Sequence, residues 1–147
     1  MLNKIRFILK MSIKNQILVI ITFLLTGIFR ASILLFSFKR IAKIMGVQGK
    51  ETSFEHDKAN DIYLKKIQWI VIKVGKNTKW ESLCLVQALT ALTFLKLKKI
   101  NATIYLGLLK ENSELLAHAW LRSGDFIVTG GKQKDKFTVI ETFASKY

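Results

Sequence analysis

The longest apolar stretch of the chain covers residues 17–38, ILVIITFLLTGIFRASILLFSF, and carries one charge, at Arg30. This length comes close to that of a bilayer-crossing helix. However, a charge past the middle of a span costs about 2.5 to 3.5 kcal/mol on insertion scales, and Gly27 allows a break before it. After the break, one helical face collects Ile33, Leu34, Phe38, Ile41 and Ile44 or Met45. The pattern favours a buried or peripheral helical hairpin, with a membrane span as the alternative.

Two later segments repeat their apolar residues with a helical period. Residues 61–74, DIYLKKIQWIVIKV, predict a helix with Asp61 as its N-cap. Residues 82–99, SLCLVQALTALTFLKLKK, predict a second helix. Ser82 is placed to cap its first turn, and three lysines close its last turn, where cations complement the helix dipole.

Short strand-like runs follow at residues 102–109, 115–122, 126–129 and 137–142. The peptides between them, ENSE, SGD and GGKQKD, have the compositions of turns. A helix followed by four antiparallel strands predicts an α+β layer.

The composition of the chain changes twice along its length. Residues 1–45 are apolar and basic, and residues 46–60 are polar with two glycines, as in a linker. Residues 61–147 hold the helix and strand patterns of the predicted core. We therefore expect an N-terminal helical region, a linker and an α+β core. His56 lies in the linker beside two acids, and we expect it to be solvated.

The charge of the chain is strongly basic and uneven. Lys and Arg number 24 against 10 Asp and Glu, giving a formal net charge of +14, and residues 1–50 contain nine basic residues and no acid. Such an asymmetry suggests an anionic partner, which could be a nucleic acid, a membrane surface or an acidic peptide. A general preference for lysine in the source genome would give the same count. Because the lysines are dispersed and the aromatic residues resemble core positions, we expect no nucleic-acid binding.

The composition also excludes several classes of chemistry. With a single cysteine, Cys84, no disulfide can form within the chain, and a reducing compartment is favoured. One cysteine and two scattered histidines do not supply the close-set ligands of a structural metal site. No glycine-rich phosphate loop is present. We expect a cytoplasmic protein, with membrane association open, that uses no metal and no cofactor.

Two reactive side chains remain, Cys84 and His118. Cys84 falls in the first turn of its predicted helix, where free N–H groups and the positive end of the helix dipole favour a thiolate. His118 lies in the middle of a predicted strand. A cysteine on a helix that packs against a strand bearing a histidine is the arrangement of a nucleophilic cysteine hydrolase. Taken alone, the spacing fits two structural core residues better. Trp80 either stacks near the nucleophile or, as the favoured reading, packs in the core.

Three segments carry a resemblance to a known family. They are WESLCL at residues 80–85, INATIYLGL at residues 100–108 and AHAWLRSGD at residues 117–125, of which AHAW is the most specific. Over residues 80–143 the chain resembles the lasso peptide maturation proteases in their separate-chain form. These are transglutaminase-like cysteine peptidases with a papain-like helix and antiparallel sheet. The front half is similar in kind only, with apolar basic helices that end in a motif like FKRIAK at residues 38–43.

The resemblance implies a function and a set of partners. The protein would remove the leader from a ribosomally made precursor peptide. The exposed N-terminal amine would then be joined to an acidic side chain by a separate ATP-using cyclase. A small leader-binding protein would present the precursor.

The resemblance also assigns the site. It makes Cys84 the nucleophile and His118 the base, but the family's third member, an Asp, aligns with Gly130. The nearest acid is Asp125. If Ser123 and Gly124 form a hairpin tip, His118 faces Thr129 and Asp125 lies about 10 Å or more from the imidazole.

The group that orients His118 is therefore left open. It is either Thr129, a backbone carbonyl or an acid from the strand of Glu141. A competing hypothesis also remains. The protein could be a non-catalytic membrane-surface or scaffold protein whose transglutaminase-like half is inert, and the missing Asp supports this alternative.

Overall fold

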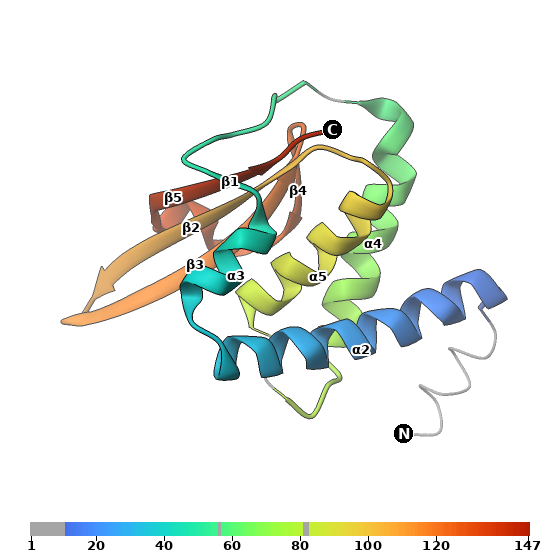
Figure 1. The fold of residues 1–147 in the computed structure, drawn as a ribbon, viewed down its shortest axis with the longest axis horizontal. Helices are drawn as coiled ribbons and strands as arrows, with labels where there is room; N and C mark the ends of the chain where they lie inside the picture. Colours follow the sequence, from blue (N-terminus) through green and yellow to red (C-terminus); the bar gives the residue numbers. More distant parts are fainter. Residues whose placement is uncertain (1–10, 56, 81–82) are drawn as a thin grey trace.

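The computed structural model describes residues 11–55, 57–80 and 83–147 (Figure 1). The helices are α2 (Ile13–Leu35), α3 (Phe38–Met45), α4 (Asp61–Gly75) and α5 (Cys84–Leu97), with the 3-10 helices η1 (Lys58–Asn60) and η2 (Gly131–Lys136). The strands are β1 (Val47–Gln48), β2 (Ala102–Glu111), β3 (Glu114–Ser123), β4 (Phe126–Thr129) and β5 (Thr138–Ser145). The predicted α+β class is confirmed.

The strands form one antiparallel sheet in the order β1-β5-β2-β3-β4. Strands β2 and β3 pair from Thr103 opposite Arg122 to Glu111 opposite Glu114. A two-residue turn with positive φ at Asn112 and Ser113 joins them, which matches the right-handed twist of the strands. The tip of this hairpin extends beyond the other strands (Figure 1).

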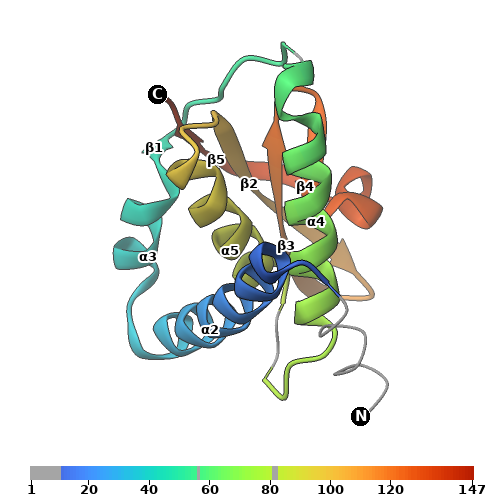
Figure 2. The same cartoon turned by 90° about the vertical axis from the view of Figure 1, so that its right-hand side faces the viewer.

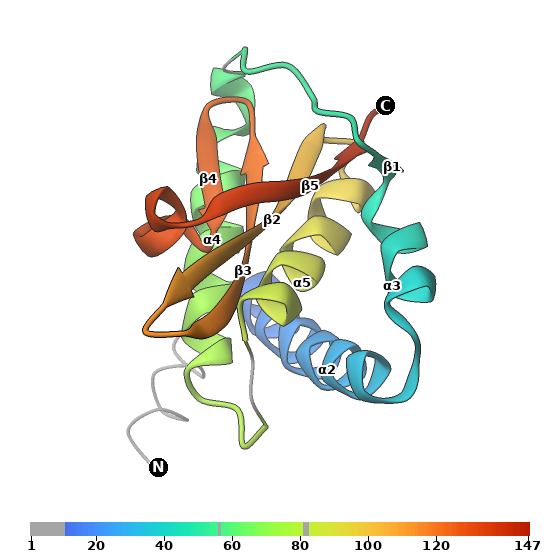
Figure 3. The same cartoon turned by 90° about the vertical axis from the view of Figure 1, so that its left-hand side faces the viewer.

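One face of the sheet packs against α4 and α5 (Figures 2 and 3). Ile104 of β2 and Leu121 of β3 join a single hydrophobic cluster there with Leu92 and Leu95 of α5 and Ile67 of α4. Helix α5 also contacts α2 on its other side. A helix covered on several sides must be apolar around most of its circumference, which explains why its sequence reads CLVQALTALTFLKL with few polar residues.

The polar stretch that follows α3 packs against the sheet. Val47 and Gln48 pair with β5, and the Thr52 N–H donates to the Thr103 Oγ1 at 2.9 Å. The threonine hydroxyls of these two residues also lie 2.9 Å apart. Residues 51–54 therefore lie against the sheet near Thr103, which is on the face opposite Ile104 by strand alternation.

The apolar N-terminal stretch differs from its prediction. The expected break at Gly27 is wrong, because α2 runs unbroken through it to Leu35. The chain breaks instead at Phe36, whose φ of −115° and ψ of 150° are extended. The Trp80 ring lies against Gly27, and its Nε1 donates to Thr26 Oγ1 at 3.3 Å. This tertiary contact lies at the position where the sequence permitted a break.

The turn between β3 and β4 also differs from its prediction. Its tip is Gly124 and Asp125, with Ser123 opposite Phe126, and a bulge follows before Leu121 pairs with Thr129. The predicted pairing of His118 with Thr129 is wrong. The predicted helix at 61–74 is confirmed as α4, but Asn60 rather than Asp61 occupies its N-cap.

Candidate active site

Cys84 is the first residue of α5 and is half-buried. Leu83 occupies the N-cap, and its carbonyl accepts from Gln87 N at 3.0 Å. The predicted cap, Ser82, lies outside the described residues. Because Leu83 is the N-cap, Cys84 is the first residue after the cap rather than the second. Leu83 has no polar side chain and caps none of the N–H groups of the first turn. These N–H groups can donate to an oxyanion.

His118 is half-buried in the middle of β3. Its Nε2 lies 2.8 Å from the carbonyl oxygen of Gly130. A carbonyl oxygen can only accept a hydrogen bond, so Nε2 carries a proton in this arrangement. In the neutral imidazole the other nitrogen, Nδ1, is then the unprotonated one and can act as a base.

Gly130 provides the acceptor where the resemblance places an Asp. Its φ is +74°, in the left-handed region, and a Cβ there would lie 2.4 Å from the Ala119 carbonyl oxygen and 2.7 Å from Trp120 Cβ. No side chain fits at this position without displacement of the backbone. Of the three groups left open by the sequence, the structure therefore pairs His118 with a backbone carbonyl.

The other two groups have different surroundings. The Thr129 hydroxyl is buried and has no hydrogen-bond partner among the described residues. Glu141 accepts from Gln48 Nε2 at 2.6 Å and from the Thr142 N–H at 2.9 Å. These hydrogen bonds, the one from Gln48 first, hold the pKa of the Glu141 carboxyl below its usual range. Neither side chain is hydrogen-bonded to His118.

Aromatic rings form the walls around His118. The centroid of its ring lies 4.9 Å from that of Phe137 and 5.9 Å from that of Trp120. Gly107 of β2 pairs with His118 of β3. A Cβ at Gly107 would lie 2.8 Å from Phe137 Cβ and 2.9 Å from Trp120 Cζ3. Sequence reasoning missed both Gly107 and Phe137. A glycine inside an otherwise apolar strand, TIYLGLL, was the available signal, because it often marks a close approach.

The structure brings the elements of Cys84 and His118 together without joining the two side chains. Helix α5 packs against β3, and its N-terminal end lies beside β3 (Figures 1 and 3). Within the described residues, the Cys84 thiol and the imidazole share no hydrogen bond. His118 lies on the same face of β3 as Trp120, whereas Leu121 faces the core under α5. Pairing of β4 with β3 ends at Leu121, and beyond it Gly130 lies against β3 next to His118.

Two other predicted residues lie away from this pair. Asp125 is in the β3–β4 turn, and His118 precedes the end of β3 by five residues, or about 16 Å at ~3.3 Å per residue. Trp80 packs on α2, where its ring centroid lies 4.8 Å from that of Phe23, so the packing interpretation holds. His56 lies outside the described residues.

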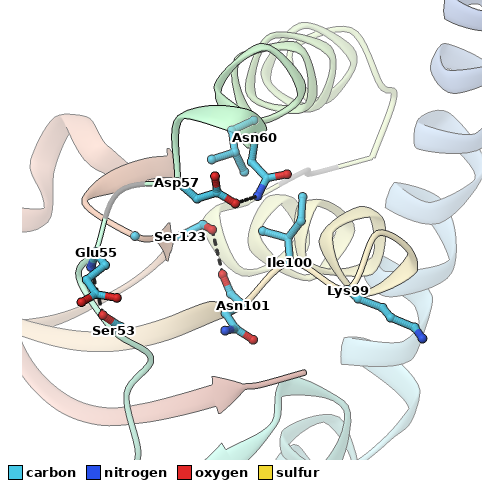
Figure 4. A pocket seen from close by; sticks show the side chains of 10 residues that line it. Ser53, Glu55, Asp57, Asn60, Lys99, Ile100, Asn101 and Ser123 are labelled. Atoms are coloured by element: carbon cyan, nitrogen blue, oxygen red, sulfur yellow. Dashed lines mark hydrogen bonds between the residues drawn. The ribbon is translucent and has the colours of Figure 1, made fainter.

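A polar cavity lies at the opposite end of α5 (Figure 4). It has a volume of about 390 Å³, and its lining includes Ser53, Glu55, Asp57, Asn60 and Asn101. Among its lining residues, Asn60 Nδ2 donates to Asp57 Oδ2 at 2.6 Å, and Ser123 Oγ donates to the Asn101 carbonyl at 2.7 Å. The length of α5, about 21 Å for its 14 residues, separates this cavity from Cys84.

The fold agrees with the comparison to known families. The profile of the Transglutaminase-like superfamily matches residues 29–142. The chain belongs to this superfamily, whose members are often cysteine hydrolases. Comparison with curated proteins and with solved structures finds no match.

Proposed function

We propose that the protein is a cysteine peptidase that removes the leader from a ribosomally made lasso precursor peptide. The transglutaminase-like superfamily includes the lasso peptide maturation proteases. The AHAW segment, residues 117–120, gives the proposal its specificity within the superfamily.

One observation carries the catalytic part of the proposal. The hydrogen bond from His118 Nε2 to the Gly130 carbonyl leaves Nδ1 as the base, on a strand whose other face packs against the helix of Cys84. In the proposed reaction Nδ1 takes the thiol proton, and the Cys84 sulfur attacks the carbonyl carbon of the scissile peptide bond. The N–H groups of the first turn of α5 stabilise the oxyanion.

The remaining steps return the enzyme to its starting state. The imidazolium gives its proton to the leaving amine of the core peptide, which departs and leaves the leader attached to Cys84 as a thioester. Water then gives a proton to Nδ1 and attacks the thioester. As the thioester breaks, the imidazolium returns this proton to the Cys84 sulfur, and the leader leaves as a carboxylic acid that ionises to the carboxylate.

The proposal includes two partners. A small leader-binding protein would hold the precursor, and an ATP-using cyclase would consume the freed amine. Both follow from the resemblance, and the freed N-terminal amine is the nucleophile that an amide-forming cyclase requires.

A second candidate is a non-catalytic scaffold with an inert transglutaminase-like domain. It is favoured by the missing carboxylate at the position of Gly130 and by the absence of a thiol–imidazole hydrogen bond among the described residues. The two candidates differ in whether Cys84 is needed for any chemical change in the precursor.

Mass spectrometry of the precursor after incubation with the protein and the leader-binding protein distinguishes them. We expect one cut and two fragments with the wild type, and an intact precursor with Cys84→Ala. Because Cys84 is the only cysteine of the chain, treatment with iodoacetamide reports on this residue alone and should also abolish the cut. Cleavage by Cys84→Ala at a tenth of the wild-type rate or more contradicts the nucleophile assignment. An intact precursor with the wild type supports the scaffold.

A further inference from the structure

Helix α2 exposes apolar side chains and buries polar ones. Its buried residues are Thr22 and Thr26. Apart from Lys14 near its start, its large exposed side chains are hydrophobic: Ile13, Ile17, Ile20, Ile21, Phe23, Leu24, Ile28, Leu34 and Leu35. A surface helix of a water-soluble protein has the opposite arrangement. An apolar stripe of this length on a folded protein marks a surface for a partner or a membrane.

The inward face of α2 is fixed by contacts with the rest of the fold. The Trp80 indole donates to Thr26 Oγ1, and Leu18 and Leu25 pack against the hydrophobic core. The hydroxyls of Thr22 and Thr26 are satisfied within the helix by the Leu18 and Phe23 carbonyls, at 2.7 Å and 2.8 Å. Rotation of α2 to bury its outer stripe would break the Trp80 bond and the leucine packing, so the stripe remains on the outside of the fold.

The packing of α2 also determines how it can meet a membrane. Among the described residues it is the one helix long and apolar enough to cross a bilayer, by length and composition. Yet it lies across α4 and α5 (Figure 2). A crossing orientation would bring α4, with its exposed Lys65, Lys66 and Lys73, to membrane depth, where charges are costly. An orientation in the plane of the membrane surface avoids this cost.

Basic side chains flank the apolar stripe. Lys14 lies at its start, and α3, which follows α2 directly, exposes Lys39, Arg40 and Lys43 while its Ile41 and Met45 are buried. Residues 1–50 contain no acid in the sequence. An apolar face with a basic border is complementary to a bilayer of anionic lipids, whose headgroups attract the border and whose acyl boundary accepts the stripe.

We propose that α2 and α3 form a monotopic surface, with α2 lying in the headgroup region of an anionic lipid bilayer and α3 bound to the headgroups. The helix α2 would then contact the membrane with its outer stripe and the active-site domain with its inner face. The Trp80 contact connects this membrane-bound helix to the segment that leads into Cys84.

Vesicle sedimentation of the full-length protein tests the proposal. We expect the wild type to bind phosphatidylcholine vesicles that contain phosphatidylglycerol, and to bind pure phosphatidylcholine about tenfold more weakly. High salt should weaken the binding to anionic vesicles, because it screens exposed charges.

Variants of the two parts of the surface separate their contributions. Ile20→Gln with Leu24→Gln, at side chains that are 58% and 57% exposed, should reduce binding about tenfold or more. The matched control is Ile62→Gln with Leu97→Gln, at side chains that are 80% and 76% exposed on α4 and α5. It makes the same chemical change elsewhere and should bind like the wild type.

A second pair of variants tests the charge. Replacement of Lys39, Arg40 and Lys43 by Gln should reduce binding to anionic vesicles about fivefold or more and leave the weak binding to neutral vesicles unchanged. Replacement of Lys65, Lys66 and Lys73 by Gln is the matched control with the same change in net charge. Circular dichroism melting of each variant verifies that it is folded.

Several outcomes would overturn the proposal. These are absence of vesicle binding, equal loss in the test and control variants, and equal affinity for neutral and anionic vesicles. Resistance to carbonate extraction would show a membrane span in place of the in-plane helix. A lipid-independent dimer that loses its self-association in the Ile20/Leu24 variant, and binds no vesicles, would assign the stripe to a second copy of the chain.

Discussion

His118 and Arg122 lie on the same face of β3, four residues apart, and have opposite surroundings. Arg122 is 3% exposed and donates five hydrogen bonds. His118 is half-buried and has one hydrogen bond, to Gly130, within the described residues. The ring of Trp120 lies between them, stacked on Tyr105 at 5.4 Å and close to His118 at 5.9 Å.

The buried charge of Arg122 is held by hydrogen bonds that link β3 to a neighbouring segment. Its guanidinium donates to the carbonyls of Thr52, Ser53 and Gly124 and to the Glu51 carboxylate. The ring of Phe54 covers its guanidinium carbon at 3.5 Å. Arg122 belongs to β3, and its guanidinium bonds or contacts each of the residues 51–54. It therefore attaches this segment to the sheet.

Tyr105 belongs to the same network. Its hydroxyl donates to Glu51 and accepts from Arg122 Nε at 2.8 Å. Burial, and then the hydrogen bond to Glu51, raise the pKa of Tyr105 to about 12. The phenol therefore stays neutral at physiological pH and keeps both of its hydrogen bonds.

The difference between the two side chains shows how one strand both stabilises the fold, through Arg122, and holds a group that can exchange a proton, His118. A side chain whose polar groups are all satisfied contributes to the fold and has nothing left for a reaction. A side chain with one nitrogen fixed and the other without a partner is oriented and still free to exchange a proton. Four predictions test this contrast, from the largest expected effect to the smallest.

Replacement of His118 should have the largest effect. We expect His118→Ala to lower the rate of precursor cleavage by about 10³-fold or more, because a positioned acid–base group contributes about 10² to 10⁴ in rate and the proposed reaction uses it in both steps. The thermal unfolding midpoint should change little, since one hydrogen bond is lost.

The matched control for this variant is His56→Ala, which removes the only other histidine of the chain. It should cleave at the wild-type rate. A His118→Ala protein that keeps a tenth of the activity would show that the imidazole is not the base.

Replacement of Arg122 should affect stability instead. We expect Arg122→Met to lower the free energy of unfolding by about 2 to 4 kcal/mol. This range begins lower than that of about 3 to 5 kcal/mol for breaking a fully buried pair, because the Glu51 side chain is 43% exposed. Below its melting temperature the variant should keep most of its cleavage rate. Urea titration and a cleavage assay at low temperature measure the two quantities.

A second substitution refines this prediction. Arg122→Lys should also be destabilising, because one ammonium cannot reach all of the acceptors that the guanidinium bonds. Stability equal to the wild type in either variant would mean that the network contributes nothing net. A rate loss as large as that of His118→Ala, with the fold intact, would remove the contrast between the two residues.

Gly130 packs against the backbone of β3 and also accepts the hydrogen bond of His118. Its replacement should therefore slow cleavage less than that of His118. In Gly130→Ala the new Cβ would collide with the Ala119 carbonyl, so the backbone must move and the acceptor of His118 Nε2 is displaced. We expect a loss of about 10- to 100-fold in cleavage rate and a shift in its pH profile, which purely structural damage would not produce.

Gly49→Ala is the matched control for Gly130→Ala. Gly49 has a similar φ of +69°, but a Cβ added there would meet no atom within 4 Å, so this variant carries the same backbone strain without the collision. It should keep the wild-type rate and pH profile. Equal losses in the two variants would show that strain, and not the position of the Gly130 carbonyl, determines the effect.

The sequence predicted the parts of the fold that depend on periodicity. The helical repeat gave α4 and α5 within a few residues, and the apolar runs gave β2 to β5 with similar accuracy, because local pattern dominates where one face is buried. It also assigned Cys84 and His118 to a helix start and a strand. It did not single out Arg122, although a charge at the end of the apolar run LLAHAWLR requires a partner once buried.

The remaining features depend on contacts that no local pattern encodes. Continuity of α2 through Gly27 accompanies packing against Trp80, which is distant in sequence. The register of β4 changes at a bulge, and one extra residue alters every pairing beyond it. The acceptor of His118 is a backbone atom, and a carbonyl is the same at every residue. The sequence therefore left three candidate partners for His118, and the structure shows that the Gly130 carbonyl is the one hydrogen-bonded to it.

The smallest effect should come from Asp125, the nearest acid in sequence to His118. It lies at the tip of the β3–β4 turn, at the Arg122 end of the strand, and the Gly130 carbonyl already holds His118 Nε2. Asp125→Asn should therefore slow cleavage less than about tenfold, against the roughly 10⁴-fold loss that follows removal of the orienting carboxylate from a serine-protease triad. Steady-state cleavage by the Asn variant, with its fold verified by circular dichroism, measures the difference. A loss approaching 10⁴-fold would mean that the turn moves Asp125 to the imidazole during the reaction, and that the Gly130 carbonyl is not the group that orients His118.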